Sequence, residues 1–352
     1  MKRILILGAA KNQLPLIQEA VLMNYYIVVC DWTKNNPGIK LAHKHYQVSI
    51  LDKEACLDIA IKENIDGVVS NYEAAMPVVA YISEKMGLVG NSSIGIENIM
   101  SKNGFRKLQK ECGLYTPNHI ISDNFSNISD IIQTYKFPII VKPCECSATR
   151  GTTKFDNYVS AEIATVFAEC CNISRNGRAC IEEYVEMPSL EIIDGDVFVY
   201  NGRILWNGLF TSIRSSYAPM VPTTQVYPIV LDDKRIQIVK DAVSVIFSNA
   251  GVKFGEYNIE MYFDSSDRLF VIEINVRQGG NGIPGTILKH SNINFTKLLV
   301  SLSVEDERYY QGVIDGNSDC RYVCRHPIYS PSSGILGGGK NNRASNSIRI
   351  FN

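Results

Sequence analysis

The chain has 352 residues and lacks the features that mark several large classes of protein. Its N-terminal apolar run extends only from Ile4 to Leu7, whereas a membrane helix needs roughly 20 apolar residues and a signal peptide needs a longer apolar core. The formal net charge is -1, which argues against a basic surface that binds nucleic acid. We therefore expect a cytoplasmic protein that acts on small molecules and binds neither membranes nor nucleic acid.

Histidine is also scarce, with 5 residues, and the 10 cysteines are scattered. The cysteine clusters lack partner histidines at zinc-binding spacing, as in Cys144 with Cys146 and Cys320 with Cys324. Other cysteines, such as Cys30, fall inside predicted strands or helices. This distribution suits reduced thiols better than a disulfide framework or a structural zinc site.

What the chain does contain is enough apolar sequence for a large core. Apolar residues make up 45% and charged residues 20%, which is typical of ordered globular proteins. At roughly 100–200 residues per domain, the length predicts two or three domains.

The first part of the chain alternates between strand and helix patterns. Strands are predicted at Ile4–Leu7, Tyr26–Cys30 and Gly67–Ser70. Helices are predicted at Leu14–Met23, Lys53–Asn64 and Met76–Met86, the last ending at Gly87. This order predicts a parallel sheet with helices on both faces.

A dinucleotide-binding domain is the competing interpretation of this pattern, with Asp31 after the second strand as a ribose ligand. The first turn, however, has Gly8 alone where the dinucleotide fingerprint has three glycines. Nicotinamide binding is therefore disfavoured.

Two lysines follow in patterns that suggest phosphate binding. Ser101 predicts the N-cap of a helix running to Cys112, which places Lys102 in its first turn. Lys142 ends the apolar strand Phe137–Lys142, and a loop of small residues follows. A solvated lysine at a strand end is the ordinary interpretation of Lys142 alone. The loop at 147–153, whose backbone N–H groups can approach an anion, favours a phosphate site instead.

The strongest local signal is a predicted antiparallel hairpin at about 257–263 and 269–276. If the loop is Ser265 to Arg268, then Phe263 pairs with Leu269 or Phe270. The register that aligns Asp264 with Leu269 also places Glu260 opposite Glu273.

Acids facing each other across such a pair repel, and burying them is costly. A structural, salt-bridged role is the alternative for two acids alone. Alternation also puts Glu273, Asn275 and Arg277 on one face with Glu260. This combination favours a divalent cation such as Mg²⁺ next to nucleotide phosphates.

The stretch 334–341 approaches a phosphate-binding P-loop in its spacing of glycines and Lys340. It ends in Asn341, where Ser or Thr must bind Mg²⁺, and no helix pattern follows. We interpret it as part of a C-terminal tail.

With these motifs in chain order, the sequence resembles the ATP-grasp superfamily, in particular its carboxylate–amine ligase branch with carbamoyl-phosphate-synthetase-like ATP domains. The resemblance rests on the segments 65–69, 86–90, 101–117, 137–152, 182–191 and 257–280. It implies an α/β chain with a Rossmann-like preATP-grasp domain followed by an ATP-grasp fold of two α+β subdomains clasping ATP. The implied boundaries are 1–97 for the first domain, 98–186 and 187–335 for the small and large subdomains, and 336–352 for a flexible tail.

The resemblance also implies the roles of individual residues. Phosphate-binding positions would be Lys102, Lys142, Ser147, Thr149 and Gly151. The backbone of Glu182, Glu183, Tyr184 and Val185 would pair with adenine, and Glu191 would bind the ribose. Two Mg²⁺ ions, for which Mn²⁺ can substitute, would bind Glu260, Glu273 and Asn275. Catalytic positions would be Lys142, Arg277 and Arg214, the last as a clamp for a substrate carboxylate; a surface role for Arg214 is equally open.

The implied reaction is ADP-forming amide synthesis through an acyl phosphate, from an amino acid or similar small carboxylate and an amine. Residues 277–284 look most like those of L-amino-acid ligases. A bicarbonate-using carboxylase of the purine or biotin type and an ATP-binding protein without turnover remain alternatives, and a homodimer is left open. Arg150 in the glycine loop and the short chain after residue 335 depart from the family pattern, so loop closure and the substrate lid can differ.

Overall fold

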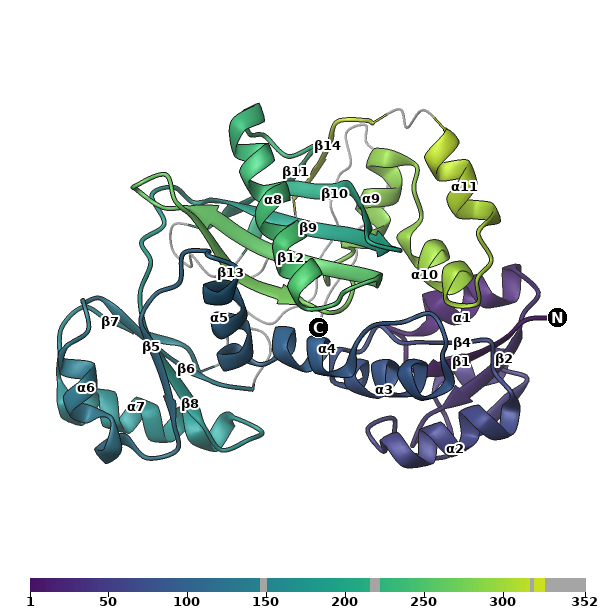
Figure 1. The fold of residues 1–352 in the computed structure, drawn as a ribbon, viewed down its shortest axis with the longest axis horizontal. Coiled ribbons are helices and arrows are strands. Elements are labelled where there is room, and N and C mark those ends of the chain that lie inside the picture. Colours follow the sequence, from purple (N-terminus) through teal and green to yellow (C-terminus); the bar gives the residue numbers. More distant parts are fainter. Residues whose placement is uncertain (146–150, 216–221, 317–319, 327–352) are drawn as a thin grey trace, which may run out of the picture.

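A computed structural model describes residues 1–145, 151–215, 222–316 and 320–326, which form three sheets flanked by helices (Figure 1). Within these ranges, none of the helices has the length and apolar character needed to cross a bilayer. Three short 3₁₀ helices lie in connecting segments: η1 (Pro37–Leu41), η2 (Glu73–Ala75) and η3 (Phe125–Asn127).

The first sheet is parallel, in the order β3-β2-β1-β4. Its strands are β1 (Arg3–Leu7), β2 (Tyr26–Cys30), β3 (Lys44–Tyr46) and β4 (Gly67–Val69). Helix α1 (Leu14–Leu22) packs on the face of Ile4 and Ile6, and helices α2 (Lys53–Glu63) and α3 (Met76–Met86) pack on the face of Leu5 and Leu7. The predicted parallel sheet with helices on both faces is confirmed.

Two helices lead from this sheet to the second one. They are α4 (Ser93–Met100) and α5 (Lys102–Glu111), separated by Ser101, whose hydroxyl accepts a hydrogen bond from Gly104 N as the N-cap of α5. Gly113, with φ of 72°, ends the turn after α5. The lysine helix predicted from Ser101 is therefore confirmed, with Lys102 at its first position.

The second sheet is antiparallel, in the order β5-β8-β6-β7. Its strands are β5 (His119–Ser122), β8 (Ala179–Glu183), β6 (Ile139–Pro143) and β7 (Thr153–Phe155), and its helices are α6 (Ser129–Gln133) and α7 (Ser160–Ile173). Figure 1 shows this sheet and its helices as a separate lobe.

The third sheet is antiparallel, in the order β13-β12-β9-β10-β11-β14. Its strands are β9 (Glu191–Tyr200), β10 (Arg203–Arg214), β11 (Pro222–Tyr227), β12 (Phe254–Phe263), β13 (Leu269–Asn275) and β14 (Val323–Arg325). Helix α8 (Asp233–Asn249) packs its apolar stripe, including Val239 and Val243, on the face of Tyr257 and Ile259. The opposite face carries most of the polar residues described below.

The last helices join the third sheet to the first. They are α9 (Ile283–Ser291), α10 (Phe295–Ser303) and α11 (Arg308–Asp315). A single apolar cluster contains Ile4 of β1, Phe198 of β9 and Phe295 of α10. The approach is tightest at Gly67, where a Cβ atom would lie 2.2 Å from the Ser303 carbonyl oxygen. The first sheet and the third sheet therefore share one core.

Candidate active site

The carboxylate hairpin has the predicted central pair but a different turn. Phe263 pairs with Leu269, and the loop is the five residues 264–268, so the predicted pairing of Asp264 with Leu269 is wrong. The Asp264 carboxylate instead closes the turn by accepting hydrogen bonds from the backbone N–H groups of Ser266 and Arg268. A β-bulge between Glu260 and Met261 then shifts the register by one, and Glu260 does lie opposite Glu273.

The neighbouring strand β9 adds two more acids to this face. Asp194 lies opposite Glu260, and Asp196 lies opposite Asn258. Both aspartates are buried, and burial raises the pKa of each to about 6. The charge of Arg214 opposes this shift at Asp194, and the hydrogen bond from the Gly279 N–H opposes it at Asp196. We call Asp194, Asp196, Glu256, Glu260 and Glu273 the acidic face.

Glu260 is the member of the acidic face with the clearest charge conflict. Burial raises its pKa to about 8, and the negative charges of Asp194 and Glu273 add to this shift. Arg214, from the end of β10, opposes the shift through an ion pair of 2.8 Å with Glu260 Oε2. The structure thus places Arg214 beside the predicted metal ligands.

The donor set at Glu260, Glu273 and Asn275 fits a hard divalent cation, because two carboxylates and one amide oxygen share one face. Asn275 Nδ2 donates to Glu273 Oε1 at 3.0 Å and to Asn258 Oδ1 at 3.4 Å, so Asn275 Oδ1 is the atom that could accept a cation. The described parts of the chain hold no ready-made cluster of three or more His, Cys, Asp or Glu ligands. A cation here would therefore complete its shell with phosphate oxygens and water.

The segment after β13 is held against the acidic face. Gly279 N donates to both carboxylate oxygens of Asp196, at 3.0 and 2.9 Å. A Cβ atom at Gly279 would lie 2.7 Å from Asp196 Oδ1 and 2.9 Å from Asn258 Nδ2, so this contact requires glycine. Arg277, two residues earlier, forms an ion pair of 3.7 Å with Glu73 beyond the first sheet.

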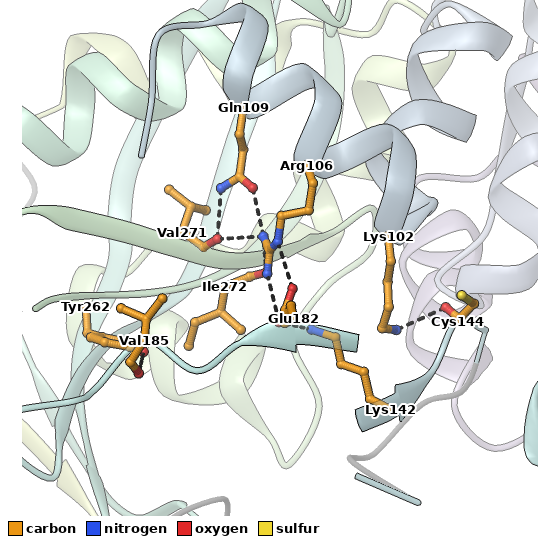
Figure 2. Close-up of polar contacts among 10 residues, drawn as sticks. All are labelled: Lys102, Arg106, Gln109, Lys142, Cys144, Glu182, Val185, Tyr262, Val271 and Ile272. Carbon is orange, nitrogen blue, oxygen red and sulfur yellow. Dashed lines mark hydrogen bonds and ion pairs between the residues drawn. The ribbon is translucent and has the colours of Figure 1, made fainter. Parts of the chain in front are cut away.

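The two predicted phosphate lysines approach the same region from different elements (Figure 2). Lys102 Nζ donates to the Cys144 carbonyl at 3.1 Å. Lys142 Nζ pairs with the Glu182 carboxylate, which is buried and also pairs with Arg106 Nε at 3.2 Å. Burial alone would raise the pKa of Glu182, but Arg106 and Lys142 hold it well below its usual range.

The predicted adenine segment is held mainly through its backbone. Glu183 N and Tyr184 N donate to the carbonyls of Asn118 and Pro138. Val185 O accepts from the Tyr262 hydroxyl of β12 at 2.6 Å. The Glu182 side chain pairs with Arg106 and Lys142, as described above, and Glu183 Oε1 accepts from Asn118 Nδ2 at 3.0 Å.

The remaining predicted site residues take no part in the contacts described above. Glu191 lies at the exposed start of β9, where its N–H donates to Ser189 Oγ at 3.3 Å. Gly151 has φ of 77°, in the left-handed region that glycine favours. Ser147 and Thr149, with Arg150, lie outside the described residues.

Sequence reasoning missed six buried polar residues of this region: Arg106, Gln109, Asp194, Asp196, Glu256 and Asn258. The pair Asp194 and Asp196 had a usable signal, because two acids alternate on one face of an otherwise apolar strand. Arg106 had none, since a lone arginine within a helix is usually a surface residue.

Comparison with known proteins follows the same lines as the geometry. No model of a protein family matches the chain. The formate-dependent phosphoribosylglycinamide formyltransferase of Mannheimia succiniciproducens is 26% identical over 186 residues, which cover 52% of this chain and 47% of that protein. The enzyme of the same name from Mannheimia haemolytica is 24% identical over 80% of this chain and 70% of its own length. The chain thus spans about half to 70% of these relatives.

Solved structures extend the similarity over nearly the whole chain. The L-amino acid ligase from Bacillus licheniformis superposes with a TM-score of 0.73 at 20% identity, covering 95% of this chain and 82% of that one. The N5-carboxyaminoimidazole synthetase from Staphylococcus aureus, solved with ADP, gives 0.70 at 18% identity, covering 86% and 77%.

The three sheets, the two lysines and the carboxylate hairpin define an ATP-grasp fold. Within that fold class, the proteins that this chain resembles are named as a phosphoribosylglycinamide formyltransferase, an L-amino acid ligase and an N5-carboxyaminoimidazole synthetase.

Proposed function

We propose that this protein is an ADP-forming ligase that joins a small carboxylic acid to an amine through an acyl phosphate. The observation that carries the proposal is the pairing of half-buried Glu260 with exposed Glu273 on a sheet face that also holds buried Arg214 and Asn275. Such a concentration of acids is unfavourable without a bound cation, and the nearby lysines suit the phosphates that accompany one.

In the proposed reaction, a carboxylate oxygen of the acid attacks the γ-phosphorus of ATP, and the bond from that phosphorus to the ADP oxygen breaks. Lys102 and Lys142 hold the phosphates, and Arg214 holds the carboxylate in line. Mg²⁺ on Glu260, Glu273 and Asn275 would neutralise charge that develops on the phosphate oxygens. The amine nitrogen then attacks the acyl carbon, inorganic phosphate leaves, and the nitrogen loses a proton as the amide forms.

The first sheet offers an approach for the amine. Ligands of open parallel sheets bind at the carboxyl ends of strands where the strand order reverses, which here lies between β1 and β4. Glu73 follows β4 and pairs with Arg277, which lies two residues after β13 of the third sheet. We propose that the amine lies beside this pair, with Arg277 next to the transferring phosphoryl group.

The experiment measures ADP release from Mg-ATP across pools of small acids, including formate and bicarbonate, with and without pools of amines. Release that needs both an acid and an amine, and that disappears in Glu273→Ala, supports the proposal and identifies the substrates. Release that needs bicarbonate alone would show a carboxylase instead. Nucleotide binding without release in any pool would contradict the proposed turnover. From the reduced cysteines we also propose a cytoplasmic location.

A further inference from the structure

Arg106 is a buried cation to which the proposed reaction assigns no role. It lies on α5, one turn after Lys102, and is only 4% exposed. Its guanidinium contacts two structural units that are far apart in the sequence (Figure 2). On one side it reaches Glu182 of β8, 76 residues away, and on the other it reaches the backbone of β13, 165 residues away.

The contact with β13 falls on the β-bulge. Val271 pairs with Met261 and Glu273 pairs with Glu260, so Ile272 is the extra residue on its strand. Arg106 Nη1 donates to the carbonyls of both Val271 and Ile272, each at 3.1 Å. A bulge leaves ladder groups unpaired, and here one guanidinium satisfies them. Without the bulge, Glu273 would not face Glu260.

The neighbouring residue Gln109 supports the same arrangement. Its Oε1 accepts from Arg106 Nη1 at 2.7 Å, and its Nε2 donates to the Val271 carbonyl at 2.9 Å. The Arg106 guanidinium also lies 5.0 Å from the centre of the Phe270 ring. The orientation of the guanidinium is therefore fixed on several sides.

The contact with Glu182 reaches the phosphate side of the site. Arg106 Nε donates to Glu182 Oε2 at 3.2 Å, and Lys142 pairs with the other carboxylate oxygen. Arg106 thus holds the carboxylate that positions Lys142. One side chain connects the lysine expected to bind phosphate with the strand segment that orients a metal-binding carboxylate.

We propose that Arg106 is a positioning residue that couples the phosphate lysine to the metal carboxylates, so that bound Mg²⁺ strengthens nucleotide binding. This inference rests on the proposed function, because it assumes the nucleotide and metal site described above. It requires arginine, since the guanidinium has five N–H donors in a rigid plane and can meet Glu182 and two carbonyls together. A lysine at this position could pair with Glu182 but could not also hold the bulge.

The test is calorimetric titration of the full chain with ADP, with and without Mg²⁺, for wild type, Arg106→Lys and Arg106→Met. Loss of a group that orients a metal ligand typically weakens metal binding about 10–100-fold. We expect Arg106→Lys to keep ADP affinity without Mg²⁺ within about threefold and to lose the strengthening by Mg²⁺ by at least about tenfold. Arg106→Met should lose both the ADP affinity measured without Mg²⁺ and the strengthening of ADP binding by Mg²⁺.

The matched control is Arg235→Lys and Arg235→Met. Arg235 pairs at 2.7 Å with Asp267 in the turn of the same hairpin, but it is partly exposed and lies at the other end from Glu273. Both Arg235 variants should keep the wild-type increase in ADP affinity that Mg²⁺ produces. If Arg106→Met does not fold, the double variant Arg106→Met with Glu182→Gln is used, because it also removes the Glu182 carboxylate that has lost its partner. This double variant is then compared with the single variant Glu182→Gln.

The outcomes separate the two proposals. Wild type that binds no ADP, with or without Mg²⁺, would contradict the proposed function itself. Wild type that binds Mg-ADP, together with equal strengthening by Mg²⁺ in Arg106→Lys, would overturn the role of Arg106 alone. If the Arg235 variants lost the strengthening by Mg²⁺ to the same extent, the proposed role of Arg106 would also be overturned. Any weakening of the hairpin would then be enough to explain the loss.

Discussion

Glu182 and the acidic face lie on either side of the candidate nucleotide site and differ in how their charge is balanced. Glu182 lies between Arg106 and Lys142, and its pKa is held well below the usual range despite burial. On the acidic face, burial raises the pKa of Asp194, Asp196 and Glu260; the charge of Arg214 opposes the shift of Asp194 and Glu260, and the Gly279 N–H opposes that of Asp196. The charge of Glu182 is balanced within the free protein, whereas burial and the neighbouring carboxylates oppose ionisation of Glu260 on the acidic face.

The difference indicates how each group meets a ligand. At Glu182 a phosphate must compete with a carboxylate for Lys142, so this side is ordered before the nucleotide binds. On the acidic face a cation relieves repulsion that the protein alone does not balance. Positioning and charge neutralisation are thus assigned to different sheets.

The largest expected effect comes from removing one acid of the proposed metal pair. Glu273→Gln should lower the rate of ADP release at least about 100-fold, because charge stabilisation by the cation would be lost. It should not lower the free energy of unfolding, since it also removes repulsion with Glu260. Rate assays and urea unfolding of the same preparation test both points. Loss of stability together with activity would show that Glu273 mainly supports the fold.

The balanced group should respond in the opposite sense. Glu182→Gln leaves Arg106 and Lys142 without their partner, and we expect the free energy of unfolding at pH 7 to fall by about 3–5 kcal/mol. Because the pKa of Glu182 is lowered, its stabilisation is present above the ordinary carboxyl range and is lost as the pH falls. Urea unfolding of wild type and variant should therefore converge in acid. A constant difference at every pH would contradict this origin.

Glu256 sharpens the comparison from the acidic face. Its side chain is buried, with only 3% of the residue exposed. Burial raises its pKa well above the usual range, and the negative charge of Asp196 adds a smaller contribution. A raised carboxyl pKa favours folding below the unfolded pKa and costs stability as the pH rises above it. Glu256→Met, next to a cavity of about 20 Å³, should raise the free energy of unfolding by about 1–2 kcal/mol at pH 8. The gain should shrink towards pH 5 in urea unfolding, and a gain independent of pH would contradict it.

The smallest effect is expected for an exposed pair. Arg235 and Asp267 lie 2.7 Å apart with side chains about half exposed, at 41% and 48%. Solvent screens such pairs, so Arg235→Met should change the free energy of unfolding by less than about 1 kcal/mol. Thermal unfolding is sufficient to measure it. A change as large as that of Glu182→Gln would mean that burial is not what separates these groups.

The parts of the fold that could be predicted from sequence are those with local signals. The helix with Lys102 follows from its N-cap Ser101 and from Gly113, and the carboxylate hairpin follows from alternation along two short strands. The strands and helices up to Met86 follow from apolar periodicity, except the short edge strand β3, which was not predicted.

The rest depends on partners that are distant in sequence. Strand β9 was not predicted, because Asp194 and Asp196 interrupt an apolar run. Their place on the acidic face follows only from the pairing of β9 with β12. The turn of the hairpin was predicted one residue out of register, since a bulge inside β13 is invisible in the alternation. The role of Arg106 depends on contacts 76 and 165 residues away.

The shared core of the first and third sheets also has a consequence for synthesis on the ribosome. Chains emerge from the N-terminus, and domains generally fold as units in that order. The face of β1 with Ile4 and Ile6 is covered partly by Phe295 and Leu298 of α10, and Gly67 of β4 lies directly against Ser303. The strands β1 and β4 therefore cannot complete their core until the residues around 303 have been translated and have left the exit tunnel.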